Sequence, residues 1–274
     1  MKDFKDKVVV ITGGATGIGF AFAKAFGAGG AKIVIGALHE NRLQEAIDKL
    51  AELGIEAKYT ICDVTQPEQV EALADFSWNA FGHVDVIVNN AGTMLPPMPV
   101  IDTPLESVQS IFNVNFYGVW HGSSIFGKRL TEQGTPAAIY NIGSENSLFH
   151  GVPMGAAYVA TKHAVLALTE SLREEVPDFI EVGLVCPGFV RSELGPPEAM
   201  TMAMDTDRFV SIAMEQIKAG EFYIVSHAYN IERINARHDE IVKAYATYAP
   251  RYEGDDEFDV RNLMGRMQEA VDNA

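Results

Sequence analysis

Short apolar runs alternate with longer segments of helical periodicity from the start of the chain to about residue 225. The runs predicted as strands are 7–12, 31–36, 55–62, 84–89, 137–142, 179–185 and 221–225. Between them, apolar residues recur at helical spacing, which predicts a helix ending at Gly29-Gly30 and further helices over 40–53, 67–81, 105–130 and 156–175. Thr65 is the predicted N-cap of the helix that begins at Pro67.

Continuous apolar strands separated by helices are typical of an α/β protein whose parallel sheet is covered on both faces. The alternation predicts one domain over residues 1–227. Residues 228–274 depart from it, with two apolar stripes at helical spacing within 231–248 and 260–271. We expect a C-terminal helical extension that packs on the same domain, since exposed stripes of that size favour aggregation.

Composition narrows the classes of function. The 274 residues are 47% hydrophobic and 21% charged, which is typical of a globular protein. Lys and Arg number 21 against 37 Asp and Glu, so the net charge is −16. An acidic chain is a poor partner for nucleic acid or an anionic membrane, and no segment approaches the roughly 20 apolar residues of a membrane span. We expect a cytoplasmic protein.

The cysteines point the same way. Cys62 and Cys186 each lie in an apolar run typical of a strand, which predicts two buried, reduced thiols in a reducing compartment. The Cys and His spacings suggest no metal site.

The first strand runs into a glycine-rich turn, Thr-Gly-Gly-Ala-Thr-Gly-Ile-Gly over residues 12–19. Strand, glycine turn and helix form the usual site for a dinucleotide pyrophosphate. Glycines admit the phosphates to the backbone, and the helix N-terminus supplies N–H donors and a partial positive charge. A P-loop is excluded because no lysine follows the last glycine. A plain tight turn between strand and helix is the structural alternative.

Three further motifs favour chemistry at this site. Asn89-Asn90-Ala91-Gly92 ends the fourth strand, and Ser144 follows the fifth. Tyr158 and Lys162 share a face of the next helix, one turn apart. A lysine beside a tyrosine favours the phenolate, so we expect a lowered Tyr158 pKa and a usable general base.

With these motifs in order, the chain resembles the short-chain dehydrogenase/reductase family, in its single-domain branch, over residues 7 to about 227. The resemblance implies a Rossmann-like, doubly wound seven-stranded parallel sheet. It also implies NAD(P)-dependent interconversion of an alcohol and a carbonyl compound. The implied catalytic residues are Asn115, Ser144, Tyr158 and Lys162.

The family's cofactor contacts carry over to residues on six segments of the chain. They are Gly13, Thr16, Gly17, Ile18, Gly19, Leu38, Asp63, Val64, Asn90, Ala91, Gly92, Tyr158, Lys162, Pro187, Gly188, Val190 and Ser192. In the family pattern Asp63 binds the adenine amino group, Asn90 holds the glycine turn, and the 187–192 segment wraps the nicotinamide. The resemblance also implies that Asn115 kinks its helix and holds a water that links Lys162 to solvent.

Ser144 and Tyr158 stand one position further apart than the family usually has them. We interpret this as one extra residue in the loop 145–157. Ser147 is the rival for the role of polarising the substrate oxygen, but it lies beyond the predicted strand end.

The preferred cofactor depends on the end of the second strand. NAD users of the family carry Asp where this chain has Ala37, and NADP users usually carry Arg where it has Leu38, or a basic residue where it has Thr16. His39 and Arg42 could approach a 2′-phosphate, or could simply be solvated at a helix start. NADP(H) is favoured over NAD(H), because no carboxylate at Ala37 repels the phosphate.

Substrate contacts are expected from the loops 93–98, 145–157 and 193–214. Met94, Phe149 and Met154 are the candidates that we single out, with Met200, Met202 and Met204 in the third loop. Methionine adapts to irregular apolar shapes, although a methionine stripe can equally be core. These residues predict a pocket for a bulky or aromatic secondary alcohol, ketone or aldehyde.

In the family, the helices bearing Asn115 and Tyr158 pack against a twofold mate, which implies a homodimer or homotetramer. The tail after His227 is longer than the usual family ending, and it could cover the pocket of its own subunit or reach a partner. In this it resembles bacterial dehydrogenases that oxidise the benzylic alcohol of lignin-derived aryl ethers. Those relatives use NAD and carry the acidic residue missing at Ala37.

Two other classes of function remain open on the same fold. One is a dinucleotide-sensing regulatory protein, although such proteins often lose part of the tetrad that this chain keeps. The other is a carbon–oxygen lyase or epimerase with a tightly bound cofactor, although that branch spaces its glycines differently.

Overall fold

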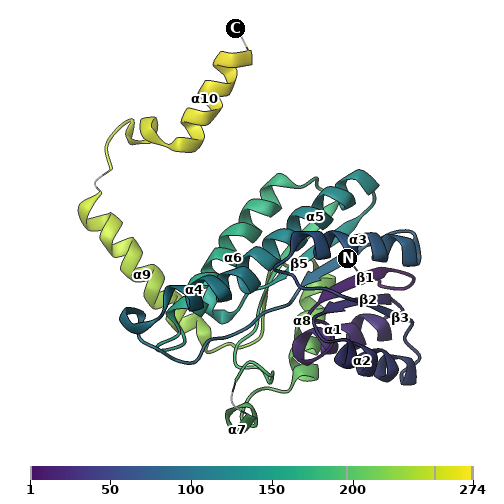
Figure 1. The fold of residues 1–274 in the computed structure, drawn as a ribbon. Helices are drawn as coiled ribbons and strands as arrows, with labels where there is room; N and C mark the ends of the chain where they lie inside the picture. The colour runs from purple at the N-terminus through teal and green to yellow at the C-terminus, as the bar shows by residue number, and fades with distance from the viewer. Residues whose placement is uncertain (1, 196, 250, 273–274) are drawn as a thin grey trace. The chain divides into compact units, whose positions relative to one another are not determined.

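The computed structural model describes residues 2–195, 197–249 and 251–272, with side chains described as far as Met267. The chain divides into two compact units, Met1–Ala228 and Tyr229–Ala274. The first contains the sheet and the second contains the last two helices (Figure 1). The prediction that the tail packs on the first unit stays a prediction.

The described residues of the first unit form a parallel seven-stranded sheet, as predicted, in the order β3-β2-β1-β4-β5-β6-β7. The strands are β1 Val8–Thr12, β2 Lys32–Ala37, β3 Ala57–Ile61, β4 Val86–Asn89, β5 Ala137–Ile142, β6 Ile180–Cys186 and β7 Tyr223–Val225. The order reverses between β1 and β4, where Ile11 pairs with Val88. Ligands of such sheets bind at this switch point, beyond the carboxyl ends of the strands.

Helices cover both faces of this sheet (Figure 1). The helices of the first unit are α1 Gly17–Ala28, α2 Glu40–Glu52, α3 Pro67–Phe81, α4 Leu105–Phe112, α5 Gly118–Gln133, α6 Ala156–Glu175 and α8 Thr206–Ala219, with the single turn α7 Pro197–Met200 in the segment before α8. Alternate residues of β1 point to opposite faces. Val9 and Ile11 pack with α1, α2 and α8, whereas Val8 and Val10 pack with α3 and α5. Burial on both faces explains the uninterrupted apolar strands.

The predicted helix over 105–130 is a continuous helical segment interrupted by a π-helical turn. A π-helical turn, Asn113–Tyr117, separates α4 from α5, which continues to Gln133. The π turn contains Asn115, the residue that the family pattern places at a helix kink.

Three local predictions are wrong. Thr65 does not cap α3; the N-cap is Gln66, and the Thr65 hydroxyl donates instead to Asp63 Oδ1 at 2.8 Å. The third predicted substrate loop, 193–214, is largely helical, because it contains α7 and the first half of α8. Strands β3, β4 and β7 are shorter than their apolar runs.

The second unit contains α9 Asn230–Tyr248 and α10 Val260–Asp272, which match the two predicted stripes. A short 3₁₀ helix, Asp255–Phe258, precedes α10.

Candidate active site

The glycine turn follows β1 with the backbone geometry that a phosphate cradle needs. Gly13 and Gly17 have φ values of +64° and +56°, a region that favours glycine. A Cβ on Gly13 would lie 2.9 Å from Ala91 Cα, and one on Gly19 would lie 2.5 Å from Asn90 Nδ2. These two glycines are therefore required by the close approach of the β4 end to the turn.

Asn90 braces the turn from the neighbouring strand. Its Nδ2 donates to the carbonyl oxygens of Thr12 and Gly13, at 2.9 and 3.1 Å. Its backbone N–H donates to Thr12 Oγ1 at 3.0 Å, and that of Ala91 donates to the same oxygen at 3.2 Å. The ends of β1 and β4 are thus joined at the switch point of the sheet by four hydrogen bonds.

The turn fits the pyrophosphate of a dinucleotide. A Cβ on Gly17 would come no closer than 4.0 Å to Ser192 Cβ, so the space over the start of α1 is open. Thr16 is the N-cap of α1, and its hydroxyl makes no capping hydrogen bond within the described residues. Helix N–H groups that carry no side-chain cap are suited to bind an anion.

The structure brings Ser144, Tyr158 and Lys162 together beside this turn. Ser144 follows β5, and Tyr158 and Lys162 lie in the first turns of α6. Lys162 Nζ lies 5.7 Å from the centre of the Tyr158 ring and donates to Ile142 O at 2.8 Å. Ser144 hydrogen-bonds to the Tyr158 hydroxyl, and this bond favours the ionised phenolate.

The prediction of a lowered Tyr158 pKa is wrong for the protein without cofactor. Desolvation raises the Tyr158 pKa above 10.0, and the charge of Glu145 adds to this, while the Ser144 hydrogen bond opposes both. Burial also lowers the pKa of Lys162 from 10.5 to about 8, which weakens the positive charge expected to act on the tyrosine. The dry surroundings of both groups outweigh their pairing.

Ser144 and Ser147 have different partners. Ser144 Oγ accepts from Asn146 N at 3.1 Å, and Ser147 Oγ accepts from Ser144 N at 3.2 Å. Together they form a capping box around the 3₁₀ turn Glu145–Ser147. Ser147 is fully buried in this structural role, whereas Ser144 contacts Tyr158. The arrangement favours Ser144 over its rival.

Asn115 is buried and holds the loop that follows β4. Its Oδ1 accepts from Thr93 N at 2.7 Å, and its Nδ2 donates to Thr93 O at 2.9 Å. Nδ2 also lies 3.3 Å from Thr161 Oγ1, next to Lys162. The side chain therefore links the π turn, the post-β4 loop and α6, which is a positioning function. The water that the family places here stays a prediction.

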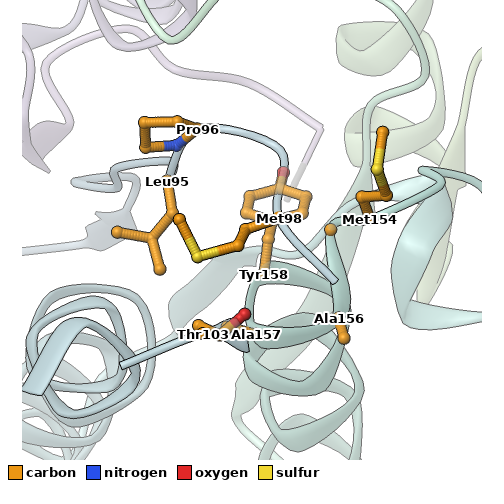
Figure 2. A pocket seen from close by; sticks show the side chains of 9 residues that line it. Leu95, Pro96, Met98, Thr103, Met154, Ala156, Ala157 and Tyr158 are labelled. Atoms are coloured by element: carbon orange, nitrogen blue, oxygen red, sulfur yellow. The ribbon is translucent and has the colours of Figure 1, made fainter. Parts of the chain in front are cut away.

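A shallow, largely apolar depression of about 20 Å³, partly open to solvent, lies over Tyr158. Its lining residues are Leu95, Pro96, Met98, Thr103, Met154, Gly155, Ala156, Ala157 and Tyr158. Figure 2 shows Leu95 and Met98 to one side of Tyr158 and Met154 to the other. Met98 N donates to Met154 O at 2.9 Å, so the two loops are joined across the depression.

The predicted substrate residues lie in different environments, and only some of them line the depression. Met154 lines the depression, with a φ of +56° that is rare for a residue with a side chain. Met94 precedes the lining residues, and Phe149 is buried against Gly151 within its own loop. Of the third segment, Met202 is exposed and Met204 packs on the core. Ala156 and Ala157 fall within the predicted loop 145–157 but were not singled out, and Thr103 lies outside the predicted loops, since no sequence signal marks small residues as pocket lining.

The segment after β6 is held from behind. Val190 bridges to Met204, and Glu145 N donates to Pro187 O at 2.8 Å. A Cβ on Gly188 would meet His227 Nδ1 at 2.5 Å and Glu145 Oε2 at 2.9 Å. Burial lowers the His227 pKa, the charge of Glu145 raises it and that of Arg208 lowers it. The predicted nicotinamide segment thus lies directly against His227 and Glu145, which the sequence motifs did not single out.

The predicted adenosine side contains Leu38, which is exposed, and Asp63, whose Oδ1 accepts from Thr65 N at 2.9 Å. Val64 O lies 2.9 Å from His121 Nδ1. Arg42, in the first turn of α2, forms an ion pair with Glu193.

Both cysteines are free and buried, as predicted. Among the described residues, no group of three or more His, Cys, Asp or Glu side chains could hold a metal ion. In the same part of the chain, none of the helices has the length and apolar character that a membrane crossing requires.

The fold is that of a doubly wound, Rossmann-like α/β protein. The model of the short chain dehydrogenase family matches residues 7–202. The 1-deoxy-11-beta-hydroxypentalenate dehydrogenase of Streptomyces avermitilis is 31% identical over 227 residues, which are 80% of this chain and 84% of that protein. A C alpha-dehydrogenase of Sphingobium sp. is 32% identical over 195 residues, 71% of this chain and 64% of that protein.

Among solved structures, a short chain dehydrogenase/reductase from Burkholderia phymatum in complex with NAD superposes with a TM-score of 0.82 at 30% identity. The match covers 89% of this chain and 97% of the other. The chain belongs to the short-chain dehydrogenase/reductase family. It is an enzyme of that oxidoreductase type, and the resemblance to C alpha-dehydrogenases is borne out.

Proposed function

We propose that the protein is an NAD(P)-dependent oxidoreductase that interconverts a secondary alcohol and a ketone, or an aldehyde, with Tyr158 as general acid and base. The observation that carries this proposal is the assembly of Ser144, Tyr158 and Lys162 beside a braced glycine turn and beneath an apolar depression. A dinucleotide bound at the turn supplies or accepts the hydride.

Each residue has a distinct part in the proposed chemistry. In the direction of reduction, Tyr158 donates its proton to the carbonyl oxygen, and its raised pKa keeps that proton in place at neutral pH. Ser144 donates a hydrogen bond to the oxygen that gains negative charge. In oxidation Tyr158 takes up the hydroxyl proton, and the Ser144 bond stabilises the phenolate that this requires.

Lys162 would bind the nicotinamide ribose and, at 5.7 Å from the centre of the Tyr158 ring, stabilise the Tyr158 phenolate. Its pKa of about 8 means that the ammonium form predominates roughly tenfold at pH 7, a margin far smaller than that of an exposed lysine. Any negative charge placed near it would raise that pKa. The lysine is therefore poised to respond to what binds beside it.

We propose NADP(H) as the preferred cofactor. Ala37 and Leu38 carry no carboxylate to bind a ribose 2′-hydroxyl or to repel a 2′-phosphate, and Arg42 lies one turn further along. The Burkholderia relative crystallised with NAD, which makes NAD(H) the alternative that the assay must separate.

The lining of the depression favours a bulky, apolar substrate such as an aryl or alicyclic alcohol or ketone. Leu95, Met98 and Met154 offer flexible apolar contacts over Tyr158. Leu105, Tyr117 and Trp120, in the helical segment 105–133, are about half or more exposed, which supports the proposed homodimer or homotetramer. We place the protein in the cytoplasm, since both of its cysteines are free.

The test is a screen of purified protein against aryl and alicyclic alcohols and ketones, with nicotinamide absorbance as the readout for NAD and NADP separately. Tyr158→Phe serves as the matched control, because it removes only the phenolic oxygen. Turnover by the wild type that Tyr158→Phe loses supports the proposal. Dinucleotide binding without turnover on any member of the panel would favour the regulatory alternative.

A further inference from the structure

An ion pair joins two segments that lie far apart in the sequence, near the open space over the glycine turn and the start of α1, which we call the cofactor groove. Arg42 Nη1 donates to Glu193 Oε2, with both side chains about half exposed. Arg42 belongs to the first turn of α2, directly after β2. Glu193 belongs to the segment after β6 and follows Ser192.

The two residues stand on opposite walls of that groove. The end of β2 lies beside the glycine turn, since Gly36 pairs with Thr12 and its carbonyl accepts from Gly13 N at 2.7 Å. On the other wall, Ser192 Cβ is 4.0 Å from where a Cβ on Gly17 would be. The Arg42–Glu193 pair therefore spans the groove on the side where the end of β2 would face an adenosine ribose.

The chemistry of this corner makes Arg42 the group that a phosphate would bind. Ala37 and Leu38 are apolar, His39 is the N-cap of α2, and Glu40 is acidic. A guanidinium binds carboxylate and phosphate oxygens with the same donors, so the two anions compete for it. In the structure those donors face a carboxylate of the chain itself.

We propose that Glu193 is a specificity-determining residue, whose carboxylate occupies Arg42 in place of a cofactor 2′-phosphate. NADP(H) must displace Glu193 to bind Arg42, whereas NAD(H) leaves the pair intact. Glu193 therefore holds the preference for NADP(H) below what Arg42 alone would give. This inference rests on the proposed function, because it needs a dinucleotide in the groove.

Two substitutions separate the parts of the pair. Glu193→Gln keeps the size of the side chain and removes its charge, so NADPH should bind about three- to tenfold more tightly, with NADH changed less than about twofold. Arg42→Gln should weaken NADPH binding roughly tenfold and leave NADH binding nearly unchanged. In the Arg42→Gln background, Glu193→Gln should lose most of its effect on NADPH.

The Kd of NADPH and of NADH is measured for each variant by isothermal titration calorimetry in the absence of substrate. Glu71→Gln is the matched control, since it neutralises the acid of another exposed Arg–Glu pair, with Arg129. The selective effect should shrink at high salt, where exposed charges are screened.

The inference is supported if Glu193→Gln strengthens the binding of NADPH more than that of NADH, and does so only when Arg42 is present. Equal effects on both nucleotides, an effect that persists without Arg42, or an equal effect from Glu71→Gln would overturn it and leave the proposed function standing. Failure of the wild type to bind either nucleotide would overturn both.

Discussion

Replacing Lys162 by methionine should stabilise the cofactor-free protein at neutral pH while abolishing turnover. The lysine is 4% exposed, and burial lowers its pKa from 10.5 to about 8. At about 1.4 kcal/mol per pH unit, this fall corresponds to roughly 3 kcal/mol of destabilisation that the buried ammonium imposes on the fold at pH 7.

Methionine removes the charge and fills the space now occupied by the aliphatic carbons of the Lys162 side chain. It also leaves Ile142 O without the donor that now lies at 2.8 Å, at a cost of about 1–2 kcal/mol. The net gain should be about 1–2 kcal/mol, which raises Tm by about 2–6 °C for a chain of this size.

The pH dependence identifies the cause. Between about pH 8 and 10.5, the unfolded chain keeps a proton on Lys162 that the folded chain has released, so wild-type stability rises with pH through this window. The advantage of Lys162→Met should therefore be largest below pH 8 and shrink toward pH 10.5.

The assay is thermal unfolding by circular dichroism at pH 7, 8.5 and 10, without nucleotide. Lys218→Met, at an exposed site, is the matched control and should change stability by less than about 0.5 kcal/mol. A Lys162→Met protein that is less stable than the wild type at pH 7, or equally shifted at every pH, would refute the reasoning.

Four further outcomes follow from the site. Tyr158→Phe should lower kcat at least about a hundredfold with dinucleotide Kd within about twofold, because only the acid and base oxygen is lost; a smaller loss of kcat would assign the proton transfer elsewhere. Ala37→Asp should shift kcat/KM toward NAD by about tenfold or more, since a carboxylate there repels a 2′-phosphate; an unchanged ratio of kcat/KM for NAD and NADP would move the specificity away from β2. Gly122→Ala should lower the free energy of unfolding by about 1–3 kcal/mol in urea titrations, because the added Cβ would lie 1.9 Å from Asn89 Oδ1; unchanged stability would show that Asn89 can move. Met154→Gly should keep Tm within a few degrees, since relief of the positive φ offsets lost packing and added chain entropy, while KM for bulky substrates rises; an unchanged KM would remove Met154 from the pocket.

The layers of the fold could be predicted because burial on both faces leaves a strong trace in the sequence. Strand ends were less predictable, since apolar residues continue past the hydrogen-bond ladder. Ile55 is apolar and buried, yet its N–H donates to Leu50 O in the turn after α2 rather than to a strand. Periodicity reports burial, and burial does not distinguish a paired residue from a covered one.

The site divides in a similar way. Helical spacing alone placed Tyr158 and Lys162 on one face, and the structure brings Ser144 to them. The direction of the Tyr158 pKa could not be predicted, because spacing gives neighbours but not the amount of water removed around them. The Arg42–Glu193 pair was equally hidden, since it joins residues 151 positions apart.

The Asn90 brace bears on how a nucleotide enters and leaves. The hydrogen bonds from Asn90 and Ala91 hold the glycine turn without any contribution from a ligand. The site for the pyrophosphate is therefore already formed in the folded protein. A nucleotide that binds to a preorganised site loses little affinity to ordering the protein, and the loop keeps its conformation when the nucleotide leaves. A preorganised site suits a nucleotide that must exchange after every catalytic cycle, because its association and dissociation can both be fast without a loss of affinity.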